Sequence, residues 1–358
     1  PFPFGTDSGS IVPEYLVQTV RERVDKDGKV VVALNENDVV KATQFYRRHE
    51  IEAIAVNLMF SFKNPKHEVR VKEIVAENLP DVYLSLSHQV LPQVRMYERG
   101  STTVFNACVG PLLKKYIDEL QRRLQKSGFT GRLLTMQSNG GVMSPEVVKD
   151  FGANTLLSGP ASGPGAALYF SRPHGLDDLI TIDMGGTSLD TCLVRDGRPA
   201  ITNQSEVAEY ALGVSSLDIR AIGAGGGSLA KVDDAGLLSV GPESAGAEPG
   251  PICYGSGGKV PTVTDANLVL GYINPDYFLG GERKLDLDLT AKEIGRQIAK
   301  PLKITATKAA EGIIQLVNAK MANGVRQVSI ERGFDPRDAI LVVAGGAGSL
   351  HGCGIAEE

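Results

Sequence analysis

The feature that most constrains the fold of this chain is a glycine turn between two apolar runs, "LITIDMGGTSLDTCLV" at residues 179–194. Both flanks have the composition of buried strands, which predicts strand–turn–strand rather than the strand–turn–helix of a P-loop. Gly185 and Gly186 let backbone N–H groups approach a ligand closely and can adopt positive φ. The turn is therefore either a β-hairpin loop or a nest of amide donors for phosphate, and the local sequence leaves both open.

Two aspartates flank this turn, and Thr187 adds a hydroxyl donor within it. Asp183 and Asp190 are poor direct ligands for phosphate, because like charges repel. Beside a phosphate, carboxylates hold Mg²⁺ or orient an attacking group. A phosphate-binding interpretation of the hairpin therefore implies a magnesium ion as well.

Two further glycine turns follow strand-like runs later in the chain. The first, "DIRAIGAGGGSLA" at 218–230, is as weak a signal as any isolated G-x-G pattern. The second, "ILVVAGGAGSLHG" at 340–352, predicts a buried strand, a glycine turn and a helix that begins near Ser349. A helix start there would offer backbone donors to a ligand, although close helix–strand packing explains the same glycines.

Composition and charge limit the class of protein. The 358 residues are enough for two to three domains, and the net charge of −5 argues against a general binder of nucleic acids or anionic membranes. No apolar run is long enough for a transmembrane helix, and no signal peptide is visible. The four scattered cysteines predict a reducing, cytoplasmic location and mostly buried thiols.

The order of elements predicts two α/β domains, residues 1–155 and 156–358. In the first, expected strands (51–60, 81–87, 131–138) alternate with expected helices (from Asn35 or Asn37, 66–78, and 103–126 with a possible kink at Pro111), which indicates a mainly parallel layer. In the second, glycine patches separate strand-like runs, and a helical pair is expected at 289–301 and 307–326. Many tight turns are the alternative explanation of the patches.

Taken together, the three glycine turns resemble the phosphate and adenosine loops of the actin-like ATPase superfamily, which has a ribonuclease H-like α/β fold. Longer motifs narrow the resemblance, among them "RMYERGSTTVFNACVGPLLKKY", "LLTMQSNGG", "LLSGPASGPGAA", "PTVTDANLVLGY" and "ERGFDPRDAILVVAGGAGSLHG". From about residue 30 onward, the chain resembles the hydantoinase A/5-oxoprolinase family. That family includes ATP-dependent hydantoinases, 5-oxoprolinases, lactamases and subunits of acetone and acetophenone carboxylases.

The resemblance implies roles for particular residues. Asp183 and Asp190 would serve Mg²⁺ and the phosphate geometry, and Asp265 is a third catalytic candidate. The residues implied to contact ATP are Gly185, Gly186, Thr187, Gly225, Gly226, Gly227, Ser228, Gly345, Gly346 and Gly348. Substrate candidates are Gln137, Asn139 and Arg95. Two of these assignments have a structural alternative, which is a capped turn before a helix at "QSNGG" and a helix cap at Asp265.

The implied function is ATP-dependent hydrolysis of a cyclic amide such as hydantoin, 5-oxoproline or a lactam, whose carbonyl oxygen is activated by phosphorylation. An ATP-dependent carboxylase subunit acting on ketones is the alternative, and a non-catalytic nucleotide-binding module is the third. The family's first D-x-G-G-T loop is absent from this sequence, so the first domain is expected to be incomplete. The chain alone is then expected to bind nucleotide poorly and not to turn over. Separately, the family resemblance implies a hydantoinase B-type partner subunit or domain.

His88, His351 and Cys253 invite a catalytic or metal role. No histidine here has the spacing of a zinc site, so a structural role is favoured for both. Cys253 is expected to be buried rather than nucleophilic.

Overall fold

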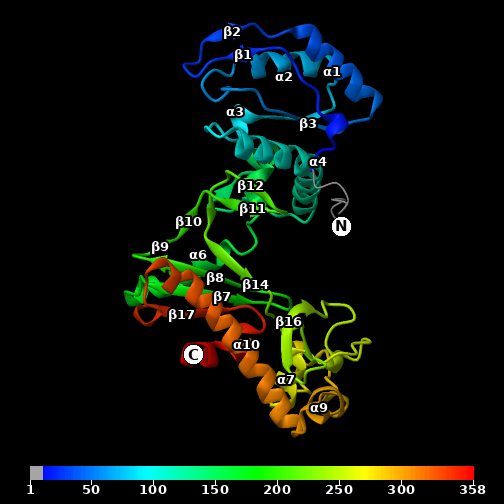
Figure 1. Ribbon diagram of the computed structural model, residues 1–358, viewed down its shortest axis with the longest axis vertical. Coiled ribbons are helices and arrows are strands. Elements are labelled where there is room, and N and C mark those ends of the chain that lie inside the picture. The colour runs from blue at the N-terminus through cyan, green and yellow to red at the C-terminus, as the bar shows by residue number, and fades with distance from the viewer. Residues whose placement is uncertain (1–10) are drawn as a thin grey trace. The chain divides into compact units, whose positions relative to one another are not determined.

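The computed structural model describes residues 11–358, which divide into two compact units (Figure 1). Unit 1 extends to Ala161 and also includes Ile201–Ser216, whereas unit 2 comprises Ser162–Ala200 and Leu217–Glu358. The sequence predicts a single boundary after residue 155, without a return of the chain to the first unit. None of the helices in the described residues is long and apolar enough to cross a bilayer.

Unit 1 is built on two parallel strands, β3 (Ala53–Val56) and β4 (Tyr83–Leu86). Helices α1 (Glu36–Arg48) and α2 (Lys66–Asn78) pack on them through a cluster of aliphatic side chains, and α4 (Met96–Lys126) covers the opposite side (Figure 1). The predicted cap is confirmed, because the Asn35 side chain accepts a hydrogen bond from the Asp38 amide at 3.3 Å.

The parallel layer of unit 1 is smaller than the sequence predicts. The run at 131–138 forms only the short strand β5 (Thr135–Met136), which pairs antiparallel with β6 (Val142–Met143) because the chain folds back between them. Helix α4 passes through Pro111 without a break. The remaining elements of unit 1 are η1 (Glu14–Leu16), β1 (Arg23–Val24), β2 (Val30–Val32), α3 (Ser87–Val90), α5 (Pro145–Asp150), η2 (Gly152–Thr155), β10 (Ile201–Thr202), β11 (Ser205–Val207) and β12 (Tyr210–Leu212).

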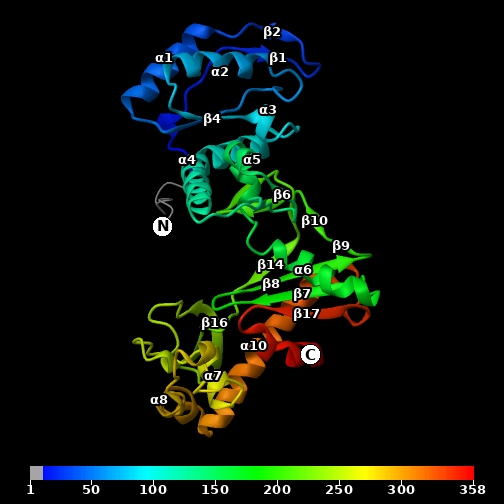
Figure 2. The same ribbon diagram turned by 180° about the vertical axis from the view of Figure 1, so that it is seen from behind.

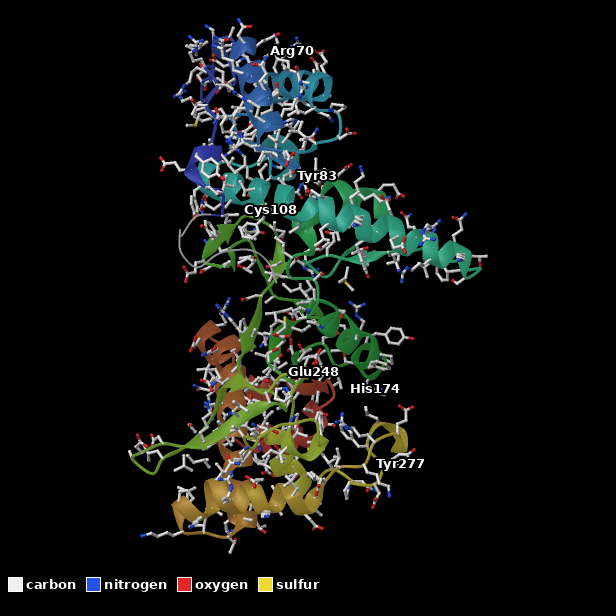
Figure 3. The ribbon with its side chains drawn as sticks, turned by 90° about the vertical axis from the view of Figure 1, so that its right-hand side faces the viewer. Arg70, Tyr83, Cys108, His174, Glu248 and Tyr277 are labelled. Carbon is white, nitrogen blue, oxygen red and sulfur yellow. The ribbon has the colours of Figure 1, made fainter. Side chains whose placement is uncertain are left out.

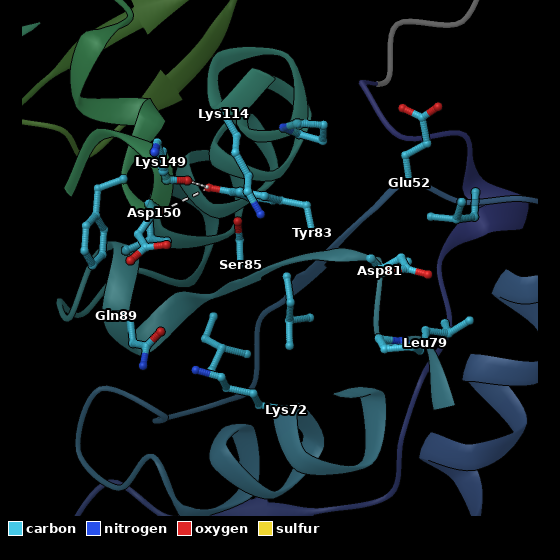
Figure 4. Close-up of a pocket in the computed structure, with 18 of the residues that line it drawn as sticks. Glu52, Lys72, Leu79, Asp81, Tyr83, Ser85, Gln89, Lys114, Lys149 and Asp150 are labelled. Atoms are coloured by element: carbon cyan, nitrogen blue, oxygen red, sulfur yellow. Dashed lines mark hydrogen bonds between the residues drawn. The ribbon is translucent and has the colours of Figure 1, made fainter. Parts of the chain in front are cut away.

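A cleft of about 1540 Å³ lies beside the free edge of β4 (Figure 4). The Tyr83 hydroxyl donates to the Lys149 carbonyl at 2.8 Å, and burial raises the pKa of Tyr83 to about 12. Four basic and five acidic side chains line this cleft, so its charge selects no class of ligand. None of the site residues predicted from the sequence lines it.

The central sheet of unit 2 has the strand order β14–β8–β7–β17, with β9 paired to β8 (Figure 2). Its strands are β7 (Leu179–Met184), β8 (Leu189–Arg195), β9 (Arg198–Pro199), β14 (Ile219–Ile222) and β17 (Ile340–Ala344). Strands β7 and β8 are antiparallel, which confirms the predicted hairpin, and β17 is parallel to β7. Helix α10 (Ala306–Val328) covers one face of the sheet and α6 (Ser162–Ser171) packs on the other.

Successive side chains of β7 point to opposite faces of the sheet, so this one strand contributes to the apolar clusters on both faces. Ile180, Ile182 and Met184 belong to the core under α10, whereas Leu179 packs with α6. Burying each of these large side chains stabilises the fold by roughly 1.5–3 kcal/mol. Asp183, between Ile182 and Met184, lies on the face of the sheet that packs against α6. It is near the carboxyl end of β7, where the apolar core stops and the glycine turn begins.

The prediction of a buried strand at 340–344 is wrong, because β17 is the edge strand and Ile340 is 47% exposed. The helical pair is confirmed as α8 (Leu287–Ile294), continued by η6 (Gly295–Ala299) and α9 (Lys300–Leu302), and followed by α10. The remaining elements of unit 2 are η3 (Arg172–His174), β15 (Ser228–Val232), β16 (Leu238–Ser244), η4 (Ile252–Tyr254), α7 (Val263–Val269), η5 (Leu279–Gly281), η6 (Gly295–Ala299, one π-helical segment), α9 (Lys300–Leu302), η7 (Ile330–Arg332), η8 (Pro336–Asp338), η9 (Gly348–Leu350) and α11 (Gly352–Glu357), with β13 (Ser216–Leu217) at the boundary.

Candidate active site

Two carboxylates face each other across the β7–β8 hairpin. Asp183 and Asp190 are direct partners in the antiparallel register, so their side chains project on the same face of the sheet. Burial raises the pKa of the Asp190 carboxyl, and the neighbouring Asp183 charge raises it further. Within residues 11–358 neither carboxylate has a basic partner within 4.0 Å, and no cluster of three potential metal ligands occurs. The pair therefore has capacity for a cation that the protein itself does not supply.

The turn between these aspartates is open. The Gly185 amide closes the hairpin by donating to the Ser188 carbonyl at 3.1 Å. A Cβ atom added at Gly185 or Gly186 would meet nothing within 4 Å, and neither residue has positive φ. The amides of Gly186 and Thr187 have no hydrogen-bond partner in the described part of the chain. The glycines thus leave space and free donors at the surface, and left-handed geometry is not the reason for them here.

The second glycine turn supports the first through backbone contacts. The Gly226 amide donates to the Gly185 carbonyl at 3.0 Å, and the Gly227 amide donates to the Gly186 carbonyl at 2.6 Å. A Cβ atom at Gly225 would lie 2.6 Å from the Thr187 amide nitrogen, so only glycine permits this approach. These two amides are therefore used inside the protein, and they position the hairpin turn rather than facing open space.

Side chains fix the second turn in its own place. Ser228 is fully buried, and its hydroxyl accepts from the Gly225 amide at 2.9 Å. The Thr264 hydroxyl donates to the Gly226 carbonyl at 2.8 Å, which attaches the turn to the start of α7. The residues Gly225–Ser228 are thus adjacent to the hairpin turn, and their role in binding nucleotide stays a prediction.

The third glycine turn meets the hairpin at the carboxyl end of β7. Gly345 has φ +85°, and a Cβ atom there would lie 2.4 Å from the Met184 carbonyl oxygen and 2.5 Å from Asp183 Oδ1. The Ala347 amide donates to the same Met184 carbonyl at 3.1 Å. Gly346 has open space around its Cβ position. The second and third glycine turns therefore both contact the β7–β8 hairpin within unit 2, the second at its turn and the third at Asp183 and Met184.

Beyond this turn, His351 is fully buried between two asparagines. Its Nδ1 lies 2.7 Å from Asn318 Oδ1 and its Nε2 lies 3.1 Å from Asn267 Nδ2, so Nδ1 donates and Nε2 accepts. Burial lowers the pKa of His351 to about 4, which keeps the ring neutral. The structural role expected for His351 fits this geometry, because the ring ties the segment after Gly348 to α10 and α7.

Asp265 is held in a structural role. Its fully buried carboxylate accepts from the backbone amides of Ile252, Cys253 and Thr262 at 3.2, 2.8 and 2.9 Å, and it forms a capping box with Thr262 at the start of α7. Both oxygens are occupied, which favours the helix-cap alternative over the catalytic one. The neighbouring Cys253 is buried, as expected, and burial raises the pKa of its thiol.

The expectation of mostly buried thiols holds for two of the four cysteines. Cys192 and Cys253 are buried, whereas Cys353 and Cys108, which lies on α4 (Figure 3), are exposed. All four are free thiols.

The three substrate candidates lie in unit 1, whereas the glycine turns lie in unit 2. Asn139 Oδ1 accepts from the Gly141 amide at 2.9 Å, and the Gln137 side chain donates to the Val142 carbonyl at 3.3 Å. Both side chains therefore support the β5–β6 turn, as the turn alternative predicted. Arg95 is exposed, pairs with Glu98 at 3.4 Å, and has φ +80° at the start of α4.

Sequence reasoning did not select Glu68, a fully buried carboxylate on α2. A signal was present, because Glu68 shares the apolar stripe of Val71 and Val75 at helical spacing. A charge on the buried face of a helix needs partners, which the sequence does not display.

The sheet, the two covering helices and the convergent glycine turns define an α/β fold of the actin-like ATPase type. A family model described as "Hydantoinase/oxoprolinase" matches residues 99–358, and one for the N-terminal region of the same family matches residues 8–79. This chain belongs to the hydantoinase/oxoprolinase family.

Several relatives are similar over nearly the whole chain. Caprolactamase subunit alpha of Pseudomonas jessenii is 43% identical over 97% of this chain, and the acetophenone carboxylase gamma subunit of Aromatoleum aromaticum is 36% identical over 96%. The crystal structure of the ATP-dependent caprolactamase from P. jessenii superposes with a TM-score of 0.87 at 42% identity, over 99% of this chain and 51% of that chain. The chain spans about half the length of these relatives.

Proposed function

We propose that this chain is the nucleotide-binding part of an ATP-dependent hydrolase that opens cyclic amides. The observation that carries the proposal is the contact of the second and third glycine turns with the hairpin that pairs Asp183 with Asp190. The names of similar proteins, a caprolactamase and 5-oxoprolinases, support the substrate class. Because the chain spans about half of the caprolactamase subunit, the complete reaction is proposed for a longer protein or assembly.

The residues present fit ATP and Mg²⁺. The open positions at Gly186 and Gly346 leave space that side chains would fill, and the free amides of Gly186 and Thr187 suit phosphate oxygens. Carboxylate oxygens are the ligands that Mg²⁺ prefers, so Asp183 and Asp190 would hold the ion directly or through water. Gly346 would border the adenosine.

ATP, when bound, supplies a phosphoryl group that makes the amide carbonyl oxygen a better electron sink. The protein's own contribution is positioning. The Gly186 and Thr187 amides offset negative charge on phosphate oxygens, and the Gly225–Gly227 turn holds them in place through backbone hydrogen bonds. Donors fixed before the reaction need no reorganisation during it, which is the main source of electrostatic stabilisation in such sites.

The relatives also support assignments about context. Several carry "subunit" in their names, so we propose a partner subunit or domain of the hydantoinase B type. Four free cysteines are consistent with a reducing compartment such as the cytoplasm.

The test is Asp183→Asn in the full-length protein. It should reduce substrate-dependent ATP hydrolysis by about 10²-fold or more, since it removes a charge from the proposed ion site, while the thermal midpoint stays within a few degrees. The matched control is Asp234→Asn, an exposed position in the turn between β15 and β16. Full activity of Asp183→Asn would refute the assignment, and nucleotide binding without any turnover would favour a non-catalytic module.

A substrate panel decides between the hydrolase and its alternative. Carboxylase subunits that act on acetone and acetophenone are also relatives, at 31% and 36% identity, and the same carbonyl activation serves them. The panel compares hydantoin, 5-oxoproline and caprolactam with ketones plus bicarbonate. Stimulation of ATP hydrolysis by ketone and bicarbonate alone would replace the amide hydrolase with the carboxylase.

A further inference from the structure

Unit 1 buries a carboxylate at the carboxyl ends of its two parallel strands. Glu68 is fully buried, and each of its oxygens accepts two hydrogen bonds. Oε1 accepts from the Leu58 amide at 2.9 Å and the Ser87 hydroxyl at 2.6 Å. Oε2 accepts from the backbone amide of His88 at 3.0 Å, and His88 Nδ1 lies 2.7 Å away. Leu58 follows β3 and Ser87 follows β4, so this carboxylate joins the two strand ends.

A buried arginine completes the cluster. Arg99, on the first turns of α4, is 1% exposed and donates to the Leu58 carbonyl at 2.8 Å and the Gln93 carbonyl at 2.9 Å. Its Nε also lies 3.2 Å from the Ser87 hydroxyl, which connects it to Glu68. Burial lowers the pKa of Arg99, and the Glu68 charge opposes that effect. The two opposite charges thus fix three loops in one arrangement.

Stability alone does not account for such a cluster. Removing two charges from water costs several kcal/mol per ion, and apolar side chains of similar volume often stabilise a fold equally well. The cluster also lies at the carboxyl ends of parallel strands, where α/β proteins place their ligands. Both facts point to a positioning function.

His88 is the member of this cluster with a ring nitrogen that makes no hydrogen bond within the described residues. Its side chain is 13% exposed, and its Nε2 has no hydrogen-bond partner among the described residues. Because the Glu68 carboxylate accepts from Nδ1–H, Nε2 of the neutral ring is a hydrogen-bond acceptor. A carboxylate behind Nδ1 with an available Nε2 is the arrangement of a general base, and here the backing carboxylate is rigidly held.

We propose that His88 is a substrate-binding and proton-accepting residue, with Nε2 taking a hydrogen bond from the N–H of a cyclic amide. The proposal rests on the proposed function for its ligand class, because a cyclic amide places an N–H donor beside its carbonyl group. Activation of that carbonyl makes the N–H more acidic. The N–H bond then breaks with its electron pair left on nitrogen, the proton moves to Nε2, and the Glu68 carboxylate stabilises the resulting imidazolium. The imidazolium returns the proton to nitrogen when the ring C–N bond breaks.

The test combines one variant with one ligand analogue, in the full-length protein. In His88→Asn the side-chain amide nitrogen replaces Nδ1 and keeps the bond to Glu68, but no atom occupies the Nε2 position. We expect at least a tenfold loss of affinity for caprolactam, with the thermal midpoint and nucleotide affinity unchanged. The control Gln89→Asn changes the adjacent exposed side chain and should retain caprolactam affinity.

The analogue N-methylcaprolactam keeps the ring and carbonyl but has no N–H. It should bind the wild-type protein at least tenfold more weakly than caprolactam, and it should leave the ¹⁵N resonance of His88 Nε2 unmoved where caprolactam shifts it. A purely structural role for His88 predicts neither difference. The comparison needs only wild-type protein, so it decides the question even if His88→Asn does not fold.

The outcomes separate this site from the proposed function. Equal affinity of wild type and a folded His88→Asn variant, or of caprolactam and its N-methyl analogue, would overturn the His88 site. ATP turnover stimulated by lactams in His88→Asn at the wild-type rate would also overturn it while leaving the proposed function intact. If the protein bound lactams selectively through His88 but never hydrolysed ATP, the proposed function would be overturned and the His88 site would stand.

Discussion

Gly345→Ala tests the contact between the third glycine turn and the hairpin. Gly345 has φ +85°, and its Cβ position is 2.4 Å from the Met184 carbonyl oxygen and 2.8 Å from its carbonyl carbon. Both are backbone atoms of β7, so no side chain can rotate away to make room. The hairpin strand or the turn itself must move.

Two costs add. A side chain in left-handed backbone costs roughly 1–2 kcal/mol, and forcing a methyl group into a closed contact costs typically 1–3 kcal/mol. The expected loss in the free energy of unfolding is therefore about 2–5 kcal/mol. For a domain of 150–250 residues this lowers the thermal midpoint by roughly 4–20 °C.

The assay is thermal and urea unfolding, with hydrogen exchange over residues 179–195 to locate the loss in unit 2. The matched control is Gly346→Ala, at the next residue, where a Cβ atom would meet nothing within 4 Å and φ is not left-handed. It should unfold within about 0.5 kcal/mol of the wild type, yet weaken nucleotide binding because the methyl group enters the open space. Equal stability of Gly345→Ala and wild type would refute the proposed close approach.

Two further predictions concern titrating groups. Because burial and Asp183 raise the pKa of Asp190 above its usual 3.8, the folded protein binds protons more tightly there, and stability falls as pH rises above that value. Asp190→Asn should therefore increase the free energy of unfolding at pH 7 in the absence of Mg²⁺, measured by urea denaturation; a decrease would contradict the carboxylate repulsion. For His351, a folded pKa of about 4 against 6.5 in the unfolded chain means that the unfolded state binds the proton first, so stability falls as pH drops from about 6.5 to about 4. The loss should be about 3 kcal/mol and absent in His351→Gln; an identical acid profile in that variant would show that another group is responsible.

Much of the fold of unit 2 was predictable because its signals are local. The hairpin at 179–195, the helix pair and the three glycine turns each follow from runs of adjacent residues. The edge position of β17 was not predictable, because burial of a strand depends on its neighbours in the sheet. In unit 1, the run at 131–138 has the composition of a strand. It forms only the two-residue strand β5, which pairs with β6, the next strand along the chain.

The site was predictable in part for the same reason. The order of glycine turns indicated Asp183 and Asp190 together, and the register places them as direct partners. The sequence could not show that Gly226 and Gly227 donate their amides to the hairpin turn, since that depends on contacts across about forty residues. For Asp265 the sequence left two roles open, a helix cap and a catalytic carboxylate. The four buried hydrogen bonds that its carboxylate accepts favour the helix cap.

The sequence by itself determined where apolar strands meet glycine turns, because periodicity and glycine content act within a few residues. The tertiary structure decided which polar groups remain free. The amides of Gly186 and Thr187 and the Nε2 atom of His88 have no hydrogen-bond partner among residues 11–358, whereas the adjacent Gly185 amide and His88 Nδ1 are paired. Hydrogen-bond satisfaction is a property of the packed chain, so donors and acceptors that remain unpaired can be identified only from the tertiary structure.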